Sequence, residues 1–355
     1  MAGEAQGALW RWQHADAEAG KACAEPVALA GVAGWSDDDH CAALVCYLRS
    51  ANLAEGEVPR PPENALPALL EDRSAARRFF EENFNAFRIL ASPGLLTSYF
   101  QPVLKGSRTP SAVFSVPVYR RPPGLHPLPS GHPRGACGLT AGRKEQGRWE
   151  PYFTRAEIES GALAGQGLEI LYLDDAIDAF IMHVQGSGHI ELDDGTVAQL
   201  SFDGKNGHPY TSIAKRLVER GHLTAKDADL DGMTNWLRSH PRPSEALNEN
   251  ESYIFFKEQA PSERGPKGSL GAELYAGRSL AADPLYHRPG MPIWISSPGL
   301  SFDGRPFQRL CIAQDTGSAI RGPQRGDIFA GTGVEARRVA GRIRHACEFI
   351  VMQPR

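Results

Sequence analysis

The sequence predicts a mainly β protein with additional helices, divided into two domains. At 355 residues the chain exceeds the usual span of a single hydrophobic core. From residue 252 to the C-terminus, short apolar stretches alternate with glycine-rich connectors, a pattern typical of a small closed or semi-closed β-barrel. Helical periodicity dominates the first hundred residues and returns only in short segments of the middle region.

Two helices are expected in the first hundred residues. The stretch SDDDHCAALVCYLRSANL (36–53) begins with Ser36 as a candidate N-cap, followed by three acids that the helix dipole favours in a first turn. The stretch SAARRFFEENFNAF (74–87) places Phe80, Phe84 and Phe87 on one helical face, which we interpret as core.

The middle of the chain predicts strands joined by turns, with a few short helices. Strands begin at Gly94, and residues 122–148 are rich in proline and glycine and predict a long surface loop. Thr154 and Glu157 form a capping box for one short helix. A helix ending near residue 180 precedes two strands joined by an Asp-Gly turn at 194–195, and another helix starts near residue 211.

The predicted barrel strands lie in the C-terminal third of the chain. Their sequences are SYIFFKE (252–258), MPIWISSP (291–298), RLCIAQD (309–315) and HACEFIVMQP (345–354). Three aspartates lie at the edges of such strands: Asp283 before a proline, Asp315 at the start of DTGSAIRG, and Asp327 in RGDIFAGTG. Aspartate beside glycine and proline is usual turn chemistry, so spacing alone favours turn or cap roles for all three residues.

The composition excludes several classes of protein. The chain is 41% hydrophobic and 23% charged, as in soluble globular proteins, and its net charge of -4 argues against nucleic acid as a partner. The N-terminus lacks the features of a signal peptide, and no apolar stretch is long enough to span a bilayer. We therefore expect that an export or lipid-anchoring segment, if the natural protein has one, is absent from this chain.

No cofactor is predicted. The eleven histidines show no HxxxH spacing, so a metal site is not expected. Nucleotide-binding glycine motifs and the GxSxG elbow are also missing. The six cysteines (23, 41, 46, 137, 311 and 347) form no CxxC pair, and disulfides and buried thiols fit their spacing equally well.

A series of stretches, in family order, resembles the membrane-bound lytic murein transglycosylase A (MltA) family. They include LTSYFQPVLKGSRTP (96–110), VPVYRRP (116–122), DAFIMHVQGSGHIELDDG (178–195), GKNGHPYTSIAKRL (204–217), PKGSLGAEL (266–274) and GRSLAADP followed by AQDTGSAIRGPQRGDIFAGTGVEARRVAG (313–341). Together they cover most of residues 94–345. The resemblance implies a double-psi β-barrel of residues 1–101 and 250–355, a smaller β-rich domain inserted as residues 102–249, and a substrate groove between the two.

The family's activity implies a reaction and a catalytic residue. The reaction is non-hydrolytic cleavage of the β-1,4 bond between N-acetylmuramic acid and N-acetylglucosamine in peptidoglycan, which forms a 1,6-anhydromuramoyl end. The resemblance assigns the single acid/base role to Asp327, a supporting role to Asp315, and a structural role to Asp283, within the C-terminal 3D (three-aspartate) domain. In the oxidising periplasm that the family implies, Cys311 and Cys347 are the first candidates for a disulfide.

Six residues are expected to bind the glycan. Thr97 and Tyr99 match the family's T-G-Y core, although Ser98 replaces its glycine and Gln101 its common glutamate. The other four, in the QGSG and GKNG stretches of the insert, are Gln185, Ser187, Lys205 and Asn206. A turn remains the alternative for both stretches, and Lys205 is also suited to the anionic lactyl-peptide part of the substrate.

Two other functions remain open at this stage. Asp315 and Asp327 fit a two-carboxylate glycoside hydrolase (a muramidase), because sequence separation says nothing about spatial distance. A non-catalytic cell-wall polysaccharide-binding protein is the second alternative, since similar barrels bind polysaccharide without cutting it. The family implies a periplasmic location, an outer-membrane lipid anchor, peptidoglycan strands as the main partner, and other cell-wall enzymes as further candidates.

Overall fold

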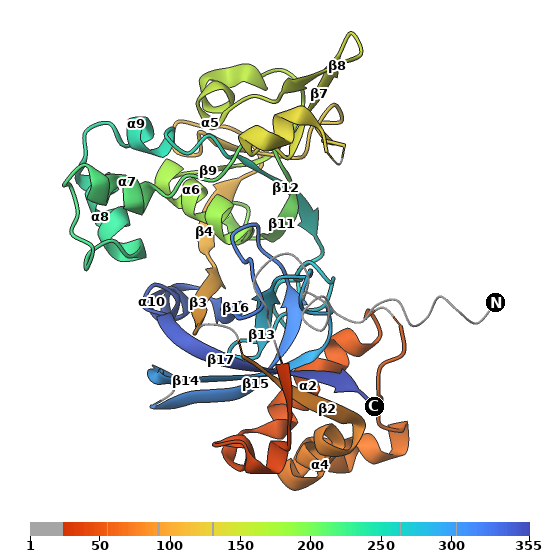
Figure 1. The fold of residues 1–355 in the computed structure, drawn as a ribbon. Helices are drawn as coiled ribbons and strands as arrows, with labels where there is room; N and C mark the ends of the chain where they lie inside the picture. Colours follow the sequence, from red (N-terminus) through yellow and green to blue (C-terminus); the bar gives the residue numbers. More distant parts are fainter. Residues whose placement is uncertain (1–23, 55, 91–92, 130, 263, 303) are drawn as a thin grey trace. The chain divides into compact units, whose positions relative to one another are not determined.

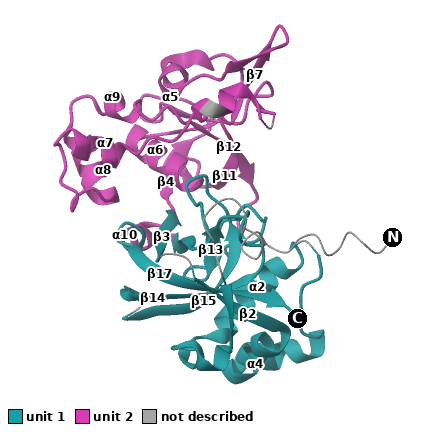
Figure 2. Ribbon diagram, viewed as in Figure 1, with its two compact units in different colours: residues 1–100, 264–331, 338–355 teal, residues 101–263, 332–337 magenta. Residues whose placement is uncertain are grey.

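The computed structural model describes residues 24–54, 56–90, 93–129, 131–262, 264–302 and 304–355. The chain forms two compact units (Figure 2): unit 1 holds residues up to 100, 264–331 and 338–355, and unit 2 holds 101–263 and 332–337. Unit 2 is thus inserted into unit 1. Its main segment ends later than the predicted boundary at 249, because strand β12 (Ile254–Gln259) pairs with β11 (Val197–Lys205) of unit 2. The SYIFFKE stretch, predicted to be a barrel strand, therefore belongs to the insert.

Six strands of unit 1 close into a barrel (Figure 1). Their order is β17-β14-β15-β13-β16-β3, and β3 pairs back onto β17 to close the ring. The predicted barrel with an inserted β-rich domain is confirmed. The barrel strands are β3 (Gly94–Gln101), β13 (Ser279–Ala282), β14 (Pro292–Phe302), β15 (Arg305–Asp315), β16 (Arg325–Thr332) and β17 (Arg344–Pro354), and β1 (Ala24–Val27) and β2 (Phe84–Ile89) extend the sheet beyond β17.

Alternating side chains of the barrel strands build two cores. One face of each strand contributes to an inner cluster that includes Leu96, Leu280, Ile293, Phe307, Ile328 and Phe349. The opposite face of β14, β15 and β17 packs against the N-terminal helices through Trp294, Leu310 and Ile350. This alternation is the period of two that a strand buried on both faces requires.

The N-terminal helices differ from the prediction at their ends. They are α2 (His40–Ala51), α3 (Leu66–Glu71) and α4 (Arg73–Asn83). Asp39, not Ser36, caps α2, because its side chain accepts the Ala42 N–H at 3.1 Å. Helix α4 ends at Asn83, whose amide donates to the Phe79 carbonyl at 2.8 Å and satisfies one of the terminal acceptors. The prediction that Phe84 and Phe87 are helical was therefore wrong, since both lie in β2.

Unit 2 is built on a six-stranded sheet, in the order β12-β11-β10-β4-β9-β5, with helix α6 (Ala176–Gln185) contributing Ala179 and Met182 to its core. The remaining strands are β4 (Val103–Ser107), β5 (Val116–Tyr119), β9 (Glu169–Leu173) and β10 (Ser187–Leu192). The predicted hairpin with its turn at 194–195 is confirmed by the antiparallel β10–β11 pair, and the capping box of Thr154 and Glu157 begins α5 (Arg155–Glu157). The other helices are α7 (Ile213–Glu219), α8 (Leu230–Ser239), α9 (Pro243–Leu247) and α10 (Val334–Ala340).

The proline-rich stretch 122–148 is more ordered than predicted. It contributes to a second, three-stranded sheet in unit 2, made of β6 (His126–Pro127), β7 (Ala141–Glu145) and β8 (Arg148–Pro151). Strands this short carry too little hydrophobic pattern to stand out from a loop.

The expected Cys311–Cys347 disulfide is contradicted. Both thiols are free and buried, as is Cys46, while Cys41 and Cys137 are free and more accessible; Cys23 lies outside the described residues. Ile293 of β14 pairs with Cys311 on one side and with β17 on the other, so a whole strand separates the two cysteines. That spacing exceeds the roughly 7 Å limit for two bridged Cα atoms.

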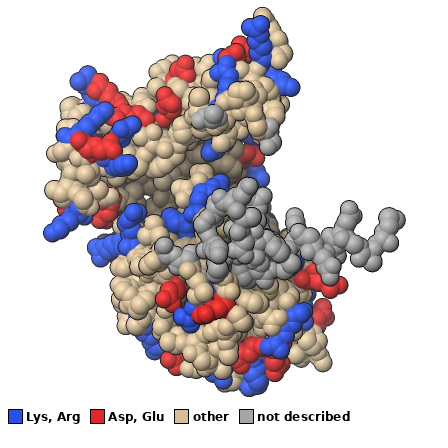
Figure 3. Space-filling model, viewed as in Figure 1, with Lys and Arg blue, Asp and Glu red and all other residues tan. Residues whose placement is uncertain are grey.

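Charged side chains of both signs are interspersed over both units on the face that Figure 3 shows. In the part of the chain that the structure describes, no helix is long and apolar enough to cross a membrane.

Candidate active site

Strand β13 holds Asp315 and Asp327 on either side of one small residue. Ala281 pairs in parallel with Asp315 of β15 and antiparallel with Asp327 of β16. Paired residues on neighbouring strands point to the same face of a sheet. The two carboxyl groups therefore share one face, with backbones roughly 10 Å apart. Ala281 places only a methyl group between them.

Asp327 is held by a directed chain of hydrogen bonds. The Thr97 hydroxyl donates to Asp327 Oδ1, and Arg325 Nη2 donates to Thr97 Oγ1 at 2.8 Å. Because a guanidinium only donates, the single hydroxyl proton of Thr97 must be directed at Asp327. When Asp327 is protonated, its proton therefore sits on Oδ2, which no described residue contacts through a hydrogen bond.

Burial raises the pKa of Asp327 to about 6. The hydrogen bond from Thr97 and the charge of Arg325 oppose this rise, and the charge of Asp315 adds to it. A carboxyl group with this pKa is present in both protonation states near neutral pH. Such a group can donate a proton in one step and accept one in the next.

Both oxygens of Asp315 accept hydrogen bonds. Tyr99 donates to Oδ2 at 2.8 Å, and the backbone N–H groups of Ser269 and Thr316 donate to Oδ1 at 2.8 and 2.9 Å. Burial raises the pKa of Asp315, and these donors act against that rise. Burial and the adjacent carboxylate also hold the pKa of Tyr99 well above its usual value, so its hydroxyl stays a donor. Both oxygens of Asp315 are thus engaged by donors from the protein.

Local sequence features bring these donors into place. Thr97 and Tyr99 are two apart on β3 and so lie on the same side of the strand. The loop carrying Ser269 comes close to β15 because residue 268 is glycine: a Cβ there would lie 2.6 Å from the Gln314 carbonyl oxygen. Thr97 and Tyr99 were predicted as glycan ligands, but the structure directs both hydroxyls at the aspartates.

Asp283 lies apart from this hydrogen-bonded group. Its side chain is 1% exposed, and it accepts the Gly322 N–H at 2.8 Å and the Leu285 N–H at 3.1 Å. Arg321 contributes a more distant contact of 3.4 Å from the solvent side. These hydrogen bonds fix the backbone at Gly322 and Leu285.

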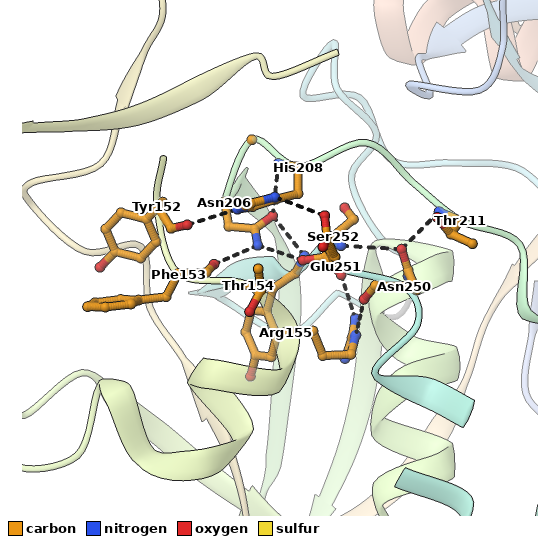
Figure 4. Close-up of polar contacts among 12 residues, drawn as sticks. Tyr152, Phe153, Thr154, Arg155, Asn206, His208, Thr211, Asn250, Glu251 and Ser252 are labelled. Atoms are coloured by element: carbon orange, nitrogen blue, oxygen red, sulfur yellow. Dashed lines mark hydrogen bonds and ion pairs between the residues drawn. The ribbon is translucent and has the colours of Figure 1, made fainter. Parts of the chain in front are cut away.

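Asn206, predicted as a glycan contact, is engaged within unit 2. Its side chain is fully buried; its amide nitrogen donates to the carbonyls of Phe153 and Glu251, each at 2.8 Å, and its oxygen accepts the Tyr253 N–H at 2.9 Å and the His208 N–H at 3.4 Å (Figure 4). Every strong hydrogen-bonding position of the amide is thus used to join segments of unit 2 that are far apart in sequence.

The other three predicted glycan contacts of the insert, Gln185, Ser187 and Lys205, lie on three different elements. Gln185 ends α6, Gly186 follows in the left-handed conformation (φ 77°), and Ser187, 9% exposed, begins β10. The QGSG stretch is therefore a helix end followed by a strand and not a hairpin turn. Lys205 is the last residue of β11 and, like Gln185, is partly exposed.

Two residues of the site were missed in the sequence. Arg325 lies two positions before Asp327, and strand alternation places both side chains on the same face, so this contact was predictable in principle. Ser269 donates through its backbone from a loop 46 residues away from Asp315, which no local pattern indicates. Among the residues that the structure describes, no cluster of three or more His, Cys, Asp or Glu side chains is arranged to hold a metal ion.

Family models and solved structures place the chain among known proteins. The MltA specific insert domain matches residues 95–257, and the 3D domain matches residues 278–353. A crystal structure of membrane-bound lytic murein transglycosylase from Agrobacterium tumefaciens is 35% identical, with a TM-score of 0.79, and the match covers 93% of this chain and 97% of that one. The chain belongs to the MltA family.

Other MltA relatives agree with this assignment. The structure of E. coli MltA with bound chitohexaose is 28% identical, has a TM-score of 0.66, and is matched over 95% of this chain and 93% of that chain. Membrane-bound lytic murein transglycosylase A of Vibrio cholerae is 36% identical over 259 residues, which are 71% of this chain and 63% of the relative. The match thus spans less than two thirds of that relative's length.

Proposed function

We propose that this MltA-family protein is a lytic transglycosylase that cleaves the β-1,4 bond between N-acetylmuramic acid and N-acetylglucosamine in peptidoglycan without adding water. The observation that carries the proposal is the asymmetry of the two acids. Asp327 has a raised pKa and one oxygen that no described residue contacts through a hydrogen bond, whereas both oxygens of Asp315 accept hydrogen bonds. One titrating carboxyl group is enough when the substrate supplies its own nucleophile.

The reaction proceeds in two proton transfers at Asp327. Protonated Oδ2 donates to the glycosidic oxygen, the bond to C1 of the muramic acid breaks, and the N-acetylglucosamine unit leaves as an alcohol. The resulting carboxylate then takes the proton of the muramoyl C6 hydroxyl as that oxygen bonds to C1. The electron pair that leaves C1 with the glycosidic oxygen is replaced by a pair from O6, and Asp327 ends protonated again. The intramolecular attack has the proximity advantage that free water lacks.

Asp315 supports this reaction as a fixed negative charge. Tyr99 and two backbone donors favour its ionised form. A carboxylate on the same face as Asp327 stabilises the positive charge that develops at C1. A two-carboxylate hydrolase would need a nucleophile or base at this position with a free oxygen. Both oxygens of Asp315 instead accept hydrogen bonds from Tyr99, Ser269 and Thr316, which favours a fixed supporting role.

The family context extends the proposal to substrate and location. E. coli MltA binds chitohexaose, a chain of N-acetylglucosamine units, which supports an amino-sugar glycan as the ligand here. Gln185, Ser187 and Lys205 of unit 2 are proposed as further glycan contacts. The relatives are named membrane-bound, and we place this protein in the periplasm, anchored to the outer membrane.

Analysis of the products tests the function. Purified peptidoglycan digested with the protein is expected to release muropeptides that end in 1,6-anhydromuramic acid, which mass spectrometry identifies by the loss of one water relative to a reducing end. Reducing-end products would indicate the hydrolase, and binding without any soluble product would indicate a wall-binding protein.

Activity is expected to fall as the pH rises through about 6, the pKa of Asp327. The reason is that the first step needs the protonated form, which is present below that pH and lost above it. Thr97→Val, which removes the donor that lowers this pKa, is expected to move the alkaline limb of the kcat profile to higher pH. A limb that moves to lower pH in Thr97→Val would contradict the assignment of that limb to Asp327.

Tyr99→Phe separates positioning of Asp315 from direct glycan binding. Losing a hydrogen bond to a charged group is worth about 1.5 kcal/mol, so kcat is expected to fall about tenfold. KM should stay within about twofold, because the hydroxyl faces the aspartate. A raised KM with unchanged kcat, measured on soluble glycan fragments, would instead make Tyr99 a substrate ligand.

A further inference from the structure

The segment 321–324, which leads into β16, is held by hydrogen bonds at three consecutive residues. The Gly322 N–H donates to Asp283 Oδ2 at 2.8 Å, and the Pro323 carbonyl lies 2.8 Å from His287 Nε2. The Gln324 carbonyl accepts the Leu95 N–H at 2.9 Å, and its side-chain oxygen accepts the Phe349 N–H at 2.9 Å. This segment ends three residues before Asp327.

Asp283 and His287 lie in one hydrogen-bonded turn directly after β13. The Asp283 carbonyl accepts the N–H of Tyr286 at 3.0 Å and of His287 at 2.9 Å. The Asp283 side chain uses both of its oxygens, Oδ1 for Leu285 within the turn and Oδ2 for Gly322 outside it. Asp283 and His287 are 1% and 4% exposed. The turn therefore presents two buried hydrogen-bonding groups to the segment 321–324.

The His287 contact has a defined direction. A carbonyl oxygen only accepts, so Nε2 must carry the proton and donate to Pro323. Burial lowers the pKa of His287 to about 4, and the nearby Asp283 carboxylate opposes that effect. The imidazole is thus neutral over the working range and acts as a fixed N–H donor.

The turn that restrains the segment 321–324 directly follows β13, the strand that pairs with Asp327 of β16. The residue before Asp283 is Ala282, which pairs with Gly326 of β16, and the next pair is Ala281 with Asp327. The segment 321–324 is also close to β3: a Cβ on Gly94 would collide with the Gln324 carbonyl oxygen. Strand β3 carries Thr97, and β16 carries Arg325 and Asp327, so both strands of this hydrogen-bond chain are in contact with the segment.

We infer that Asp283 and His287 are positioning residues that hold the segment 321–324 so that Arg325 and Asp327 meet Thr97 in the geometry needed for proton transfer. This inference rests on the proposed acid/base role of Asp327. It gives the third aspartate of the 3D domain a defined task and adds His287, to which sequence patterns assign no role.

The test compares two substitutions of similar size at residue 287. His287→Gln keeps an N–H donor near the position of Nε2, whereas His287→Leu removes it. We expect His287→Leu to lower kcat at least about tenfold, since small displacements of a catalytic group are costly, with KM within about twofold. We also expect its alkaline pH limb to move upward, because loosened contacts with Thr97 and Arg325 no longer lower the pKa of Asp327. His287→Gln should restore most of kcat and the original limb.

Asp283→Asn provides an independent second variant. An amide has one acceptor, so either Leu285 or Gly322 loses its bond, and the same loss of kcat is expected. Arg305→Gln is the control, because Arg305 is an exposed residue at the start of β15, outside the segment 321–324 and its contacts with Asp283 and His287. All rates are referred to the folded fraction, measured by circular dichroism.

The inference is overturned if His287→Leu and His287→Gln have equal kcat and equal pH limbs, or if folded Asp283→Asn has the same kcat as the control Arg305→Gln. If His287→Leu does not fold, the comparison of His287→Gln and Asp283→Asn with wild type decides the matter in the same way. Failure of the proposed function would look different, because wild type itself would then form no anhydro product.

Discussion

Asp327→Asn is expected to lower kcat on peptidoglycan by about a thousandfold, within the range that one general acid contributes. The amide keeps the shape of the carboxyl group and its acceptor for Thr97, but it has no proton to give at the glycosidic oxygen. Binding of the glycan should persist. Sedimentation with insoluble peptidoglycan measures binding, and release of soluble muropeptides measures turnover.

The same substitution is expected to stabilise the fold above pH 6. Folding raises the pKa of Asp327 from 3.8 to about 6, so the ionised form carries a free-energy penalty in the folded state that is fully present above pH 6 and absent below 3.8. Removing the charge should therefore add about 1 to 2 kcal/mol to the free energy of unfolding at neutral pH, after allowance for partial exposure.

Glu348→Gln is the matched control, since Glu348 is an exposed acid on β17 of the same barrel. It should match wild type in both turnover and stability. Unchanged release of soluble muropeptides by Asp327→Asn would remove Asp327 as the catalyst, and a large loss of stability would contradict its raised pKa.

Asn206→Leu is expected to destabilise unit 2 by about 3 to 5 kcal/mol. The substitution leaves the Phe153 carbonyl and the Tyr253 N–H without their Asn206 partner, each costing about 1 to 3 kcal/mol, while the Glu251 carbonyl keeps the Arg155 N–H as a donor. Denaturant unfolding followed by circular dichroism measures the loss. Lys226→Met, at an exposed position of the same unit, should stay within about 0.5 kcal/mol of wild type. Normal stability combined with a raised KM in Asn206→Leu would restore the original prediction that Asn206 binds the glycan.

Asn206 also shows where sequence interpretation reaches its limit. Asn-Gly at 206–207 indicated a turn or a loop facing the substrate, and nothing local reveals partners 45 and 53 residues away. The buried network around it depends on contacts between distant segments, which one sequence does not display. Strand alternation, by contrast, is visible in the sequence. It predicts that Arg325 and Asp327 share one face of their strand and that Thr97 and Tyr99 share one face of theirs.

The barrel itself was partly visible in the sequence. Three of its long strands carry enough apolar pattern to be recognised. Strand β13 does not, because its four residues, SLAA, are too short and too small to stand out. Yet β13 sets the spacing of the two acids and leads into the turn of Asp283 and His287. The family resemblance predicted distinct roles for Asp315 and Asp327, but their different hydrogen-bond partners could not be predicted from the sequence.

Digestion of peptidoglycan in water enriched in oxygen-18 tests the central claim most directly. If the muramoyl C6 hydroxyl attacks C1, mass spectrometry will find muramoyl ends that lack one water and contain no solvent oxygen. Muramoyl products that carry oxygen-18 at a reducing end would show that water attacks C1, and would contradict the single-acid transglycosylase mechanism.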